Sequence, residues 1–206
     1  MGYDANIERQ SAKYSVDRSF RRARFGILLH DLDSATCAWV GMNRARYREG
    51  TDISPVIGVR NRLVERVVLE CCGIPDDGVS PPTIAANVGY LLPSREFKSF
   101  LFDGSDADGD RLLEMCAEVF VAVESYAQAH RSLEALAKSL VSFPTQPRDN
   151  VAQRLPVIWH MLGERAKAEA VMCAELERTA SLGGEGADQY SGFCARVRAR
   201  YRSKSG

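Results

Sequence analysis

The sequence has no excess charge of either sign and no long apolar run, and these two absences exclude broad classes of function. Lys and Arg together number 27, as do Asp and Glu, so the whole chain has no net attraction for nucleic acid or a membrane surface. No run approaches the roughly 18 apolar residues that a membrane-spanning helix needs. The opening stretch, MGYDANIERQ, is polar and lacks the apolar centre of a signal peptide, so we expect a cytoplasmic protein.

The sequence also lacks the residue patterns of common catalytic and metal sites. None of His30, His130 and His160 has a second His or a Cys at ligand spacing, which argues against a zinc site. No Gly-x-Ser-x-Gly motif for a nucleophilic serine is present, and no Gly-rich phosphate loop. We therefore expect neither an enzyme nor a cofactor or metal, and a Cys–His pair assembled by the fold stays open as an alternative.

The six cysteines lie at no metal-ligand spacing from the histidines, and no signal peptide accompanies them that would favour disulfides. Four of them fall in predicted helices among apolar neighbours, where a free cysteine behaves as a small hydrophobic residue. In a chain of this length we expect all of them to be reduced and buried rather than paired in disulfides. They are Cys37, Cys71, Cys72, Cys116, Cys173 and Cys194.

The first third of the chain contains the clearest strand patterns. Two apolar runs, at residues 26–32 and 37–42, flank a short polar linker at 33–36 and predict a hairpin. Residues 19–25 are a candidate first strand, and residues 55–60 a further short strand after a polar loop at residues 44–54.

Helical spacing begins after these strands. Asn61 is a good helix N-cap, apolar residues recur at helical spacing, and Gly73 is suited to end the helix. Residues 83–92 alternate apolar and polar positions and predict a half-buried strand, whereas residues 95–102 fit either a strand or a short helix. A long helix, capped by Asp106 or Asp108, is expected to run to about residue 142.

The C-terminal part of the sequence is helical throughout. Residues 151–162 and 164–180 predict a helix pair around Gly163, and residues 189–202 predict a last helix. Strands early and helices late predict an α+β fold: an antiparallel sheet of four to five strands with helices on one face and a C-terminal helical segment. We expect an α+β domain with the long helix at residues 1–142 and a helical extension packed on it at residues 143–206.

Charge is unevenly distributed along the chain. Residues 1–66 hold 12 basic and 8 acidic residues, residues 67–140 hold 5 and 12, and residues 141–206 hold 10 and 7. The acidic middle contains a run of aspartates, at residues 103–110, that resembles a calcium loop. It places Arg111 and Ala117 where such a loop requires Gly and Glu, so we interpret it as a turn followed by helix capping.

Two clusters of charged residues are candidate binding surfaces. Asp110, Glu114 and Glu118 are four residues apart, so they form a row of like charge on one helical face. Such a row is either a solvated or internally neutralised face, or a docking strip for a basic partner. The predicted partner-binding residues are Asp103, Asp106, Asp108, Asp110, Glu114 and Glu118, with Tyr126 or Phe102 as an apolar anchor.

Arginines near the N-terminus form the second cluster. The candidates for contact with an anion or nucleic acid are Arg21, Arg22, Arg24, Arg44 and Arg46. No interleaved aromatic set accompanies them, so edge protection of the sheet or pairing with the acidic helix is the favoured interpretation.

From residue 19 to 140 the order of features resembles a group of uncharacterised bacterial α+β domain proteins. The resembling segments are SFRR, a hairpin ending in WVGMNRA, ISPVIGVRNRLVE, PPTIAANVGYLLP and then a long helix. Some proteins of this type resemble immunity proteins that neutralise secreted bacterial toxins by binding them. The resemblance implies a protein-binding role and carries over no catalytic residues. We therefore expect an inhibitor that covers a toxin's active site, with a nucleic-acid-binding regulator or defence component as the alternative.

Overall fold

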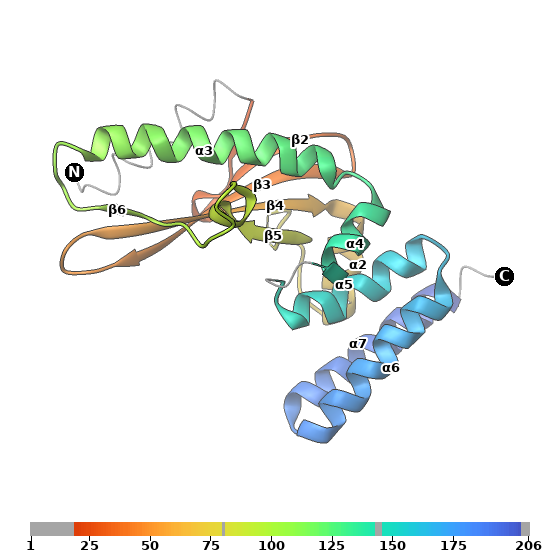
Figure 1. Ribbon diagram of the computed structural model, residues 1–206. Coiled ribbons are helices and arrows are strands. Elements are labelled where there is room, and N and C mark those ends of the chain that lie inside the picture. Colours follow the sequence, from red (N-terminus) through yellow and green to blue (C-terminus); the bar gives the residue numbers. More distant parts are fainter. Residues whose placement is uncertain (1–18, 80, 143–145, 203–206) are drawn as a thin grey trace. The chain divides into compact units, whose positions relative to one another are not determined.

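The computed structural model describes residues 19–79, 81–142 and 146–202, and the chain in it forms two compact units. Unit 1 comprises residues 1–60 and 85–131, and unit 2 comprises residues 61–84 and 132–206. Figure 1 shows the strands and the helix α3 in unit 1 and the remaining helices in unit 2. None of the described helices is both long and apolar enough to cross a membrane.

Unit 1 is built on an antiparallel sheet, which confirms the predicted α+β fold. Its order is β1-β2-β3-β4-β5, and β6 pairs with the same strand, β4, as β5 does. Six strands are present, because the short segments β1 and β6 both join the sheet. The bounds are β1 Arg21–Arg22, β2 Leu28–Asp31, β3 Thr36–Arg46, β4 Thr51–Asn61, β5 Ile84–Asn87 and β6 Phe100–Phe102.

The predicted hairpin at residues 26–42 is present as β2 and β3. Leu29 pairs with Trp39, and the Asp33 carboxylate closes the turn by accepting the backbone N–H groups of Ala35 and Thr36 at 2.8 and 2.7 Å. The polar stretch 44–54, predicted as a loop, is mostly strand. It forms the β3–β4 hairpin, whose turn occupies residues 47–50, because pairing between neighbouring strands satisfies the backbone whatever the side chains are.

The prediction of one strand over residues 83–92 is wrong beyond Asn87. There the chain leaves the sheet and turns into the short 3-10 helix η2, Val88–Leu91. Gly89 lies so close to the following segment that an added Cβ would be 2.0 Å from the Glu96 oxygen. The Asn87 amide holds this excursion in place with four hydrogen bonds. It donates to the Pro55 and Lys98 carbonyls and accepts from the N–H groups of Gly89 and Lys98.

Helix α3, Asp108–Ala129, lies across one face of the sheet (Figure 1). Its buried stripe includes Met115, Val119 and Val123, at the spacing that an amphipathic helix requires. Phe120 meets Phe20 edge to face, with ring centroids 5.2 Å apart, which places the N-terminal edge of the sheet in the same core.

The prediction of a single helix to residue 142 is wrong, because α3 ends at Ala129 and α4, Leu133–Ser142, begins four residues later. The apolar spacing continues across the break, and this made the two helices look continuous. A local signal for a new start exists in Ser132, whose hydroxyl accepts the Ala135 N–H at 3.2 Å in the manner of an N-cap.

Unit 2 consists of helices. Besides α4 these are α2 Arg62–Cys72, α5 Arg148–Met161, α6 Arg165–Leu182 and α7 Glu185–Arg202. The predicted caps of α2 are confirmed: the Asn61 carboxamide accepts the N–H groups of Leu63 and Val64, and Gly73 adopts a φ of 73° that other residues avoid. The predicted helix pair around Gly163 is α5 and α6. The last helix starts four residues earlier than predicted, at Glu185.

A buried ion pair joins α2 to α5 inside unit 2. The Arg154 guanidinium donates from Nε and Nη2 to the two oxygens of the Glu65 carboxylate, both at 2.9 Å. The two side chains are 2% and 0% exposed. A single unpaired charge in the core would strongly destabilise the fold, so each of these two side chains compensates the charge of the other.

Candidate functional site

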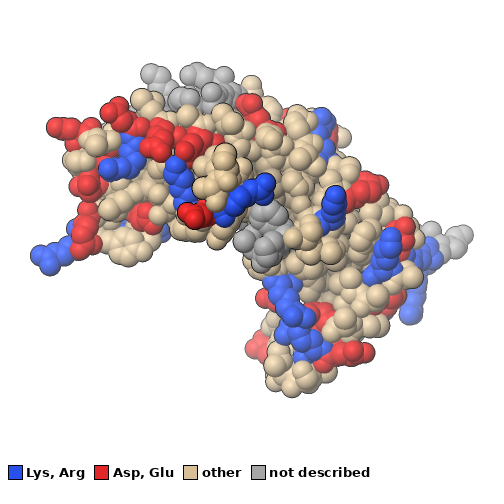
Figure 2. Space-filling model, viewed as in Figure 1, with Lys and Arg blue, Asp and Glu red and all other residues tan. Residues whose placement is uncertain are grey.

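The predicted acidic ladder lies on one face of α3, as the spacing of its residues indicated. Asp110 and Glu114 are exposed and Glu118 is half-buried. Figure 2 shows acidic side chains gathered over the part of unit 1 where α3 begins. We call the exposed side of this helix and the loop before it the acidic face: Asp103, Asp106, Asp110, Leu113, Glu114, Glu118 and Val121.

The loop before α3 divides the predicted aspartates into two groups. Asp103 and Asp106 are exposed, but Asp108 is buried and accepts the Gly104 N–H at 2.8 Å and Arg111 Nη1 at 2.7 Å. Asp108 therefore closes the loop and is not available to a partner. Hydrogen bonds from Ser105, followed by the charge of Arg111, hold the pKa of Asp103 below its ordinary value.

Lys98 partly neutralises the ladder. Its ammonium lies 2.6 Å from Glu118 Oε1 and 3.1 Å from Glu114 Oε1. Partial burial favours a lower pKa for Lys98, but hydrogen bonds and charges from Glu118 and Glu114 outweigh it, so the pKa is raised. The cation that offsets these carboxylates is thus a lysine from the β5–β6 connection. Sequence reasoning had considered only the arginines for this role.

The two predicted apolar anchors are wrong, because Tyr126 and Phe102 are both buried in the core of unit 1. The exposed apolar side chains on α3 are instead Leu113, 58% exposed, and Val121, 68% exposed. They lie eight residues apart, two helical turns, on the same side as the carboxylates. An apolar stripe therefore lies within the acidic face.

The predicted arginine cluster is exposed throughout. Arg21 and Arg22 form β1, at the edge of the sheet, and Arg44 and Arg46 are in the outer part of β3. The structure brings the Arg44 guanidinium next to Gly26, 3.8 Å from the position of an added Cβ, and therefore close to the segment that contains Arg24.

Two of the three histidines contact backbone carbonyls, and most of the cysteines are buried. His30 contacts the Ser19 carbonyl and the Phe20 ring, and His130 contacts the Tyr126 carbonyl at 2.7 Å. Burial raises the pKa of the Cys71, Cys72 and Cys194 thiols, which disfavours their reactive thiolate forms. The expectation that all cysteines are buried is wrong for Cys173, which is exposed, and for Cys72, which is half-buried. Within the described ranges, no group of three or more His, Cys, Asp or Glu side chains is arranged to hold a metal ion.

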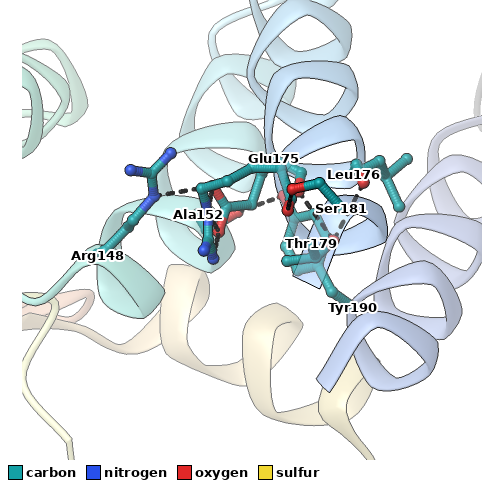
Figure 3. A network of polar contacts seen from close by, with 8 residues as sticks. Arg148, Ala152, Glu175, Leu176, Thr179, Ser181 and Tyr190 are labelled. Atoms are coloured by element: carbon teal, nitrogen blue, oxygen red, sulfur yellow. Dashed lines mark hydrogen bonds and ion pairs between the residues drawn. The ribbon is translucent and has the colours of Figure 1, made fainter. Parts of the chain in front are cut away.

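A cavity of about 590 Å³ lies among the helices of unit 2, between α2, α5, α6 and α7. Figure 3 shows the polar network at its wall, centred on Glu175 of α6. Glu175 Oε2 accepts Arg148 Nε at 3.1 Å, and Oε1 accepts Arg178 Nη2 at 2.5 Å. The Tyr190 hydroxyl, which lines the same cavity, donates to the Ala152 carbonyl at 3.1 Å.

The groups of this network satisfy one another. Hydrogen bonds from Arg178, the largest cause, and from Arg148 lower the pKa of Glu175 in spite of burial, so it stays ionised near neutral pH. Burial raises the pKa of Tyr190 far above its ordinary value, so the phenol stays protonated. A paired carboxylate and a neutral phenol are suited to hold helices together and poorly suited to accept a substrate's proton.

Sequence reasoning missed this network. The spacing of Glu175 and Arg178, three residues apart on one helix, was the available signal, but Arg148 and Tyr190 are brought in by tertiary packing alone.

Comparisons with known proteins add no relative to this description: no family model, curated protein or solved structure matches the chain. The functional argument therefore depends on the geometry of the two units.

Proposed function

We propose that the chain is a protein-binding module, an immunity-type inhibitor that neutralises a bacterial toxin by covering its active site with the acidic face of α3. The partner surface would be basic, with an apolar centre. Lys or Arg side chains around a catalytic cleft, as in an enzyme that acts on a polyanion, have this chemistry.

The observation that carries the proposal is the combination of exposed apolar and acidic side chains on one helix. Leu113 and Val121 offer area that can be removed from water, at about 25 cal/mol per Å². The carboxylates of Asp106 and Asp110 lie at the N-terminal end of the same face and would steer a cationic partner towards it. Apolar anchors contribute most to affinity in protein interfaces, whereas peripheral charge contributes most to the rate of association.

Part of the negative charge of the acidic face is already compensated, which limits where on this face a basic partner would be attracted most strongly. Glu118 and Glu114 share Lys98, so a partner's cation would have to compete with an existing ion pair there. Asp106 and Asp110 are exposed and lie at the N-terminal end of the same face. The strongest attraction is therefore expected around the start of α3.

The test uses a toxin encoded next to this chain's gene, bound to the wild-type protein and to three variants. Asp106→Lys combined with Asp110→Lys should lower the association rate constant roughly tenfold at low salt, and the difference should shrink as salt is added. Leu113→Asp should mainly raise the dissociation rate constant, because it places a charge in the apolar centre of the contact.

The matched control is Glu49→Lys, which reverses an equally exposed carboxylate in the β3–β4 turn. It should change both rate constants less than twofold, and surface plasmon resonance measures all of them. If the control slows association as much as the double variant, overall charge governs binding and the acidic face is not the docking site. Tight binding of duplex DNA that falls steeply with salt would favour the nucleic-acid alternative.

A further inference from the structure

A second, smaller hollow of about 270 Å³ lies in unit 2, at the end where α5 finishes, α6 begins and α7 finishes. It is separate from the cavity beside Glu175, and the two have no lining residue in common. The side chains that line it come from all three helices: His160, Arg165, Glu169, Arg198, Tyr201 and Arg202.

Positive charge dominates this hollow. Three guanidinium groups face one carboxylate, so the lining has two formal positive charges in excess. The Glu169 carboxylate is already engaged by Arg198, whose Nη2 and Nε donate to Glu169 Oε2 at 2.7 and 3.0 Å. Hydrogen bonds from Arg198, the largest cause, lower the pKa of Glu169, so this pair is fully ionised near neutral pH. The other two guanidinium groups of the lining belong to Arg165 and Arg202.

A flat aromatic pair forms one side of the hollow. The rings of His160 and Tyr201 are stacked, with centroids 4.4 Å apart and planes inclined by only 8°. Both nitrogens of the His160 ring are buried and, among the described residues, have no hydrogen-bond partner. Burial lowers the pKa of His160, so the ring is neutral near pH 7 and adds a polar flat surface without adding charge. Buried polar atoms without hydrogen bonds lower the stability of the folded state, so the fold gains little from this ring as a packing group alone.

Guanidinium groups are the preferred partners of phosphate in proteins, because their fork of N–H donors matches two phosphate oxygens at once. A phosphomonoester carries between one and two negative charges at pH 7, which matches the excess in the hollow. A carboxylate would match only one of these charges. The volume exceeds that of a phosphoryl group and leaves room for a flat substituent against the aromatic pair.

We propose that the hollow lined by Arg165, Arg202 and the His160–Tyr201 pair is a binding site for a small phosphomonoester, with the phosphoryl group between the arginines. This site is independent of the acidic face of α3, since it lies in the other unit and has the opposite charge. It adds a small-molecule site to a chain whose proposed role is protein binding.

The experiment is calorimetric titration of the full chain with inorganic phosphate and, separately, with adenosine monophosphate. Arg165→Gln and Arg202→Gln should each weaken binding roughly tenfold or more, the loss expected for one charge-assisted contact. Both arginines are exposed, so the variants should fold normally, which circular dichroism verifies. Tighter binding of the nucleotide would assign a contribution to the aromatic pair, and equal affinities would assign recognition to the phosphoryl group alone.

Two further variants separate a built site from diffuse attraction. Lys167→Gln removes a positive charge two residues from Arg165 on α6, where the side chain lies over the Trp159 ring outside the hollow, and it should change affinity less than twofold. Glu169→Gln should strengthen binding several-fold, because it removes the one repelling charge and frees Arg198. No binding of either ligand at millimolar concentration would overturn the proposal. So would an equal loss in Lys167→Gln and Arg165→Gln, or a weaker affinity in Glu169→Gln.

Discussion

Each unit of this protein contains a prominent group of carboxylates, and the two groups differ in burial. In unit 1, Asp103, Asp106 and Asp110 are at the surface, and the core consists of the sheet and the apolar stripe of α3. In unit 2, Glu65 and Glu175 are buried, and each is held by arginines from other parts of that unit. A surface carboxylate costs little on folding and is available to a partner, whereas a buried one is committed to the fold.

The two units also differ in the interactions that stabilise them. The helices of unit 2 are tied by ion pairs that reach across the sequence: Glu65 to Arg154, Glu175 to Arg148, Glu169 to Arg198 and Glu70 to Arg200. Unit 1 has strand pairing and the neutral hydrogen bonds of Asn87 in the corresponding role, and its ion pairs, such as Asp33 to Arg131 and Glu118 to Lys98, are more exposed than the pair of Glu65 and Arg154. Stability should therefore depend on charge in unit 2 far more than in unit 1.

The largest expected effect comes from Arg154→Met, which leaves the Glu65 carboxylate buried without its cation. Breaking one side of a buried ion pair typically costs about 3–5 kcal/mol, and urea unfolding at pH 7 measures the loss. Hydrogen exchange should show the faster opening first in the amides of α2 and α5.

The control is the double variant Glu65→Leu with Arg154→Met, which replaces both charges by apolar groups of similar size. It should recover most of the lost stability, because no uncompensated charge remains. A double variant as unstable as the single one would show that packing volume, not charge, is what this position requires.

A smaller loss is expected from Asn87→Ala in unit 1. The substitution removes neutral hydrogen bonds and leaves the Lys98 N–H and carbonyl without partners at the β5–β6 excursion, which should cost about 2 kcal/mol. Asn43→Ala, at an exposed position of β3, should stay within about 0.5 kcal/mol of the wild type. Equal unfolding midpoints for the two variants would show that Asn87 does not stabilise the β5–β6 excursion.

The smallest expected effect is a change in how the folding stability depends on pH in the acidic range. The pKa of Glu175 is lowered from its ordinary value of 4.5, mainly by hydrogen bonds from Arg178. The folded state therefore binds this proton less readily than the unfolded state does. The resulting stabilisation is present above about pH 4.5 and is lost as the pH falls through the lower, folded value.

Glu175→Gln should accordingly be less stable than the wild type at pH 7, and the two should converge as the pH falls below about 4.5. Glu177→Gln, an exposed position on the same helix, should run parallel to the wild type over this range. Urea midpoints at four pH values test this, and a constant difference between Glu175→Gln and the wild type would contradict it.

Elements with local signals could be predicted from the sequence. Helix α2 was placed correctly because Asn61 and Gly73 fix its ends through their own side chain and backbone, without help from the rest of the fold. The β2–β3 hairpin was found for the same reason, through Asp33 and the linker after it. The row of carboxylates on α3 follows from helical spacing, which is also local.

What could not be predicted depends on residues far apart in the sequence. Glu65 and Arg154 are separated by 89 positions, and nothing in either neighbourhood indicates the pairing. Lys98 reaches Glu118 from another element, so the internal compensation of the ladder was invisible. The end of β5 at Asn87 depends on the close approach of residues 96–98 to Gly89, which alternation of apolar residues does not report.

The strand order of unit 1 has a consequence for behaviour at high concentration. On one side the described sheet finishes with β1, only two residues long, and on the other the outer partners of β4 are the separate short strands β5 and β6. At these two flanks, a neighbouring molecule that tried to extend the sheet would find only short rows of backbone donors and acceptors. We expect these short outer strands to hinder fibril growth and strand exchange at the two flanks.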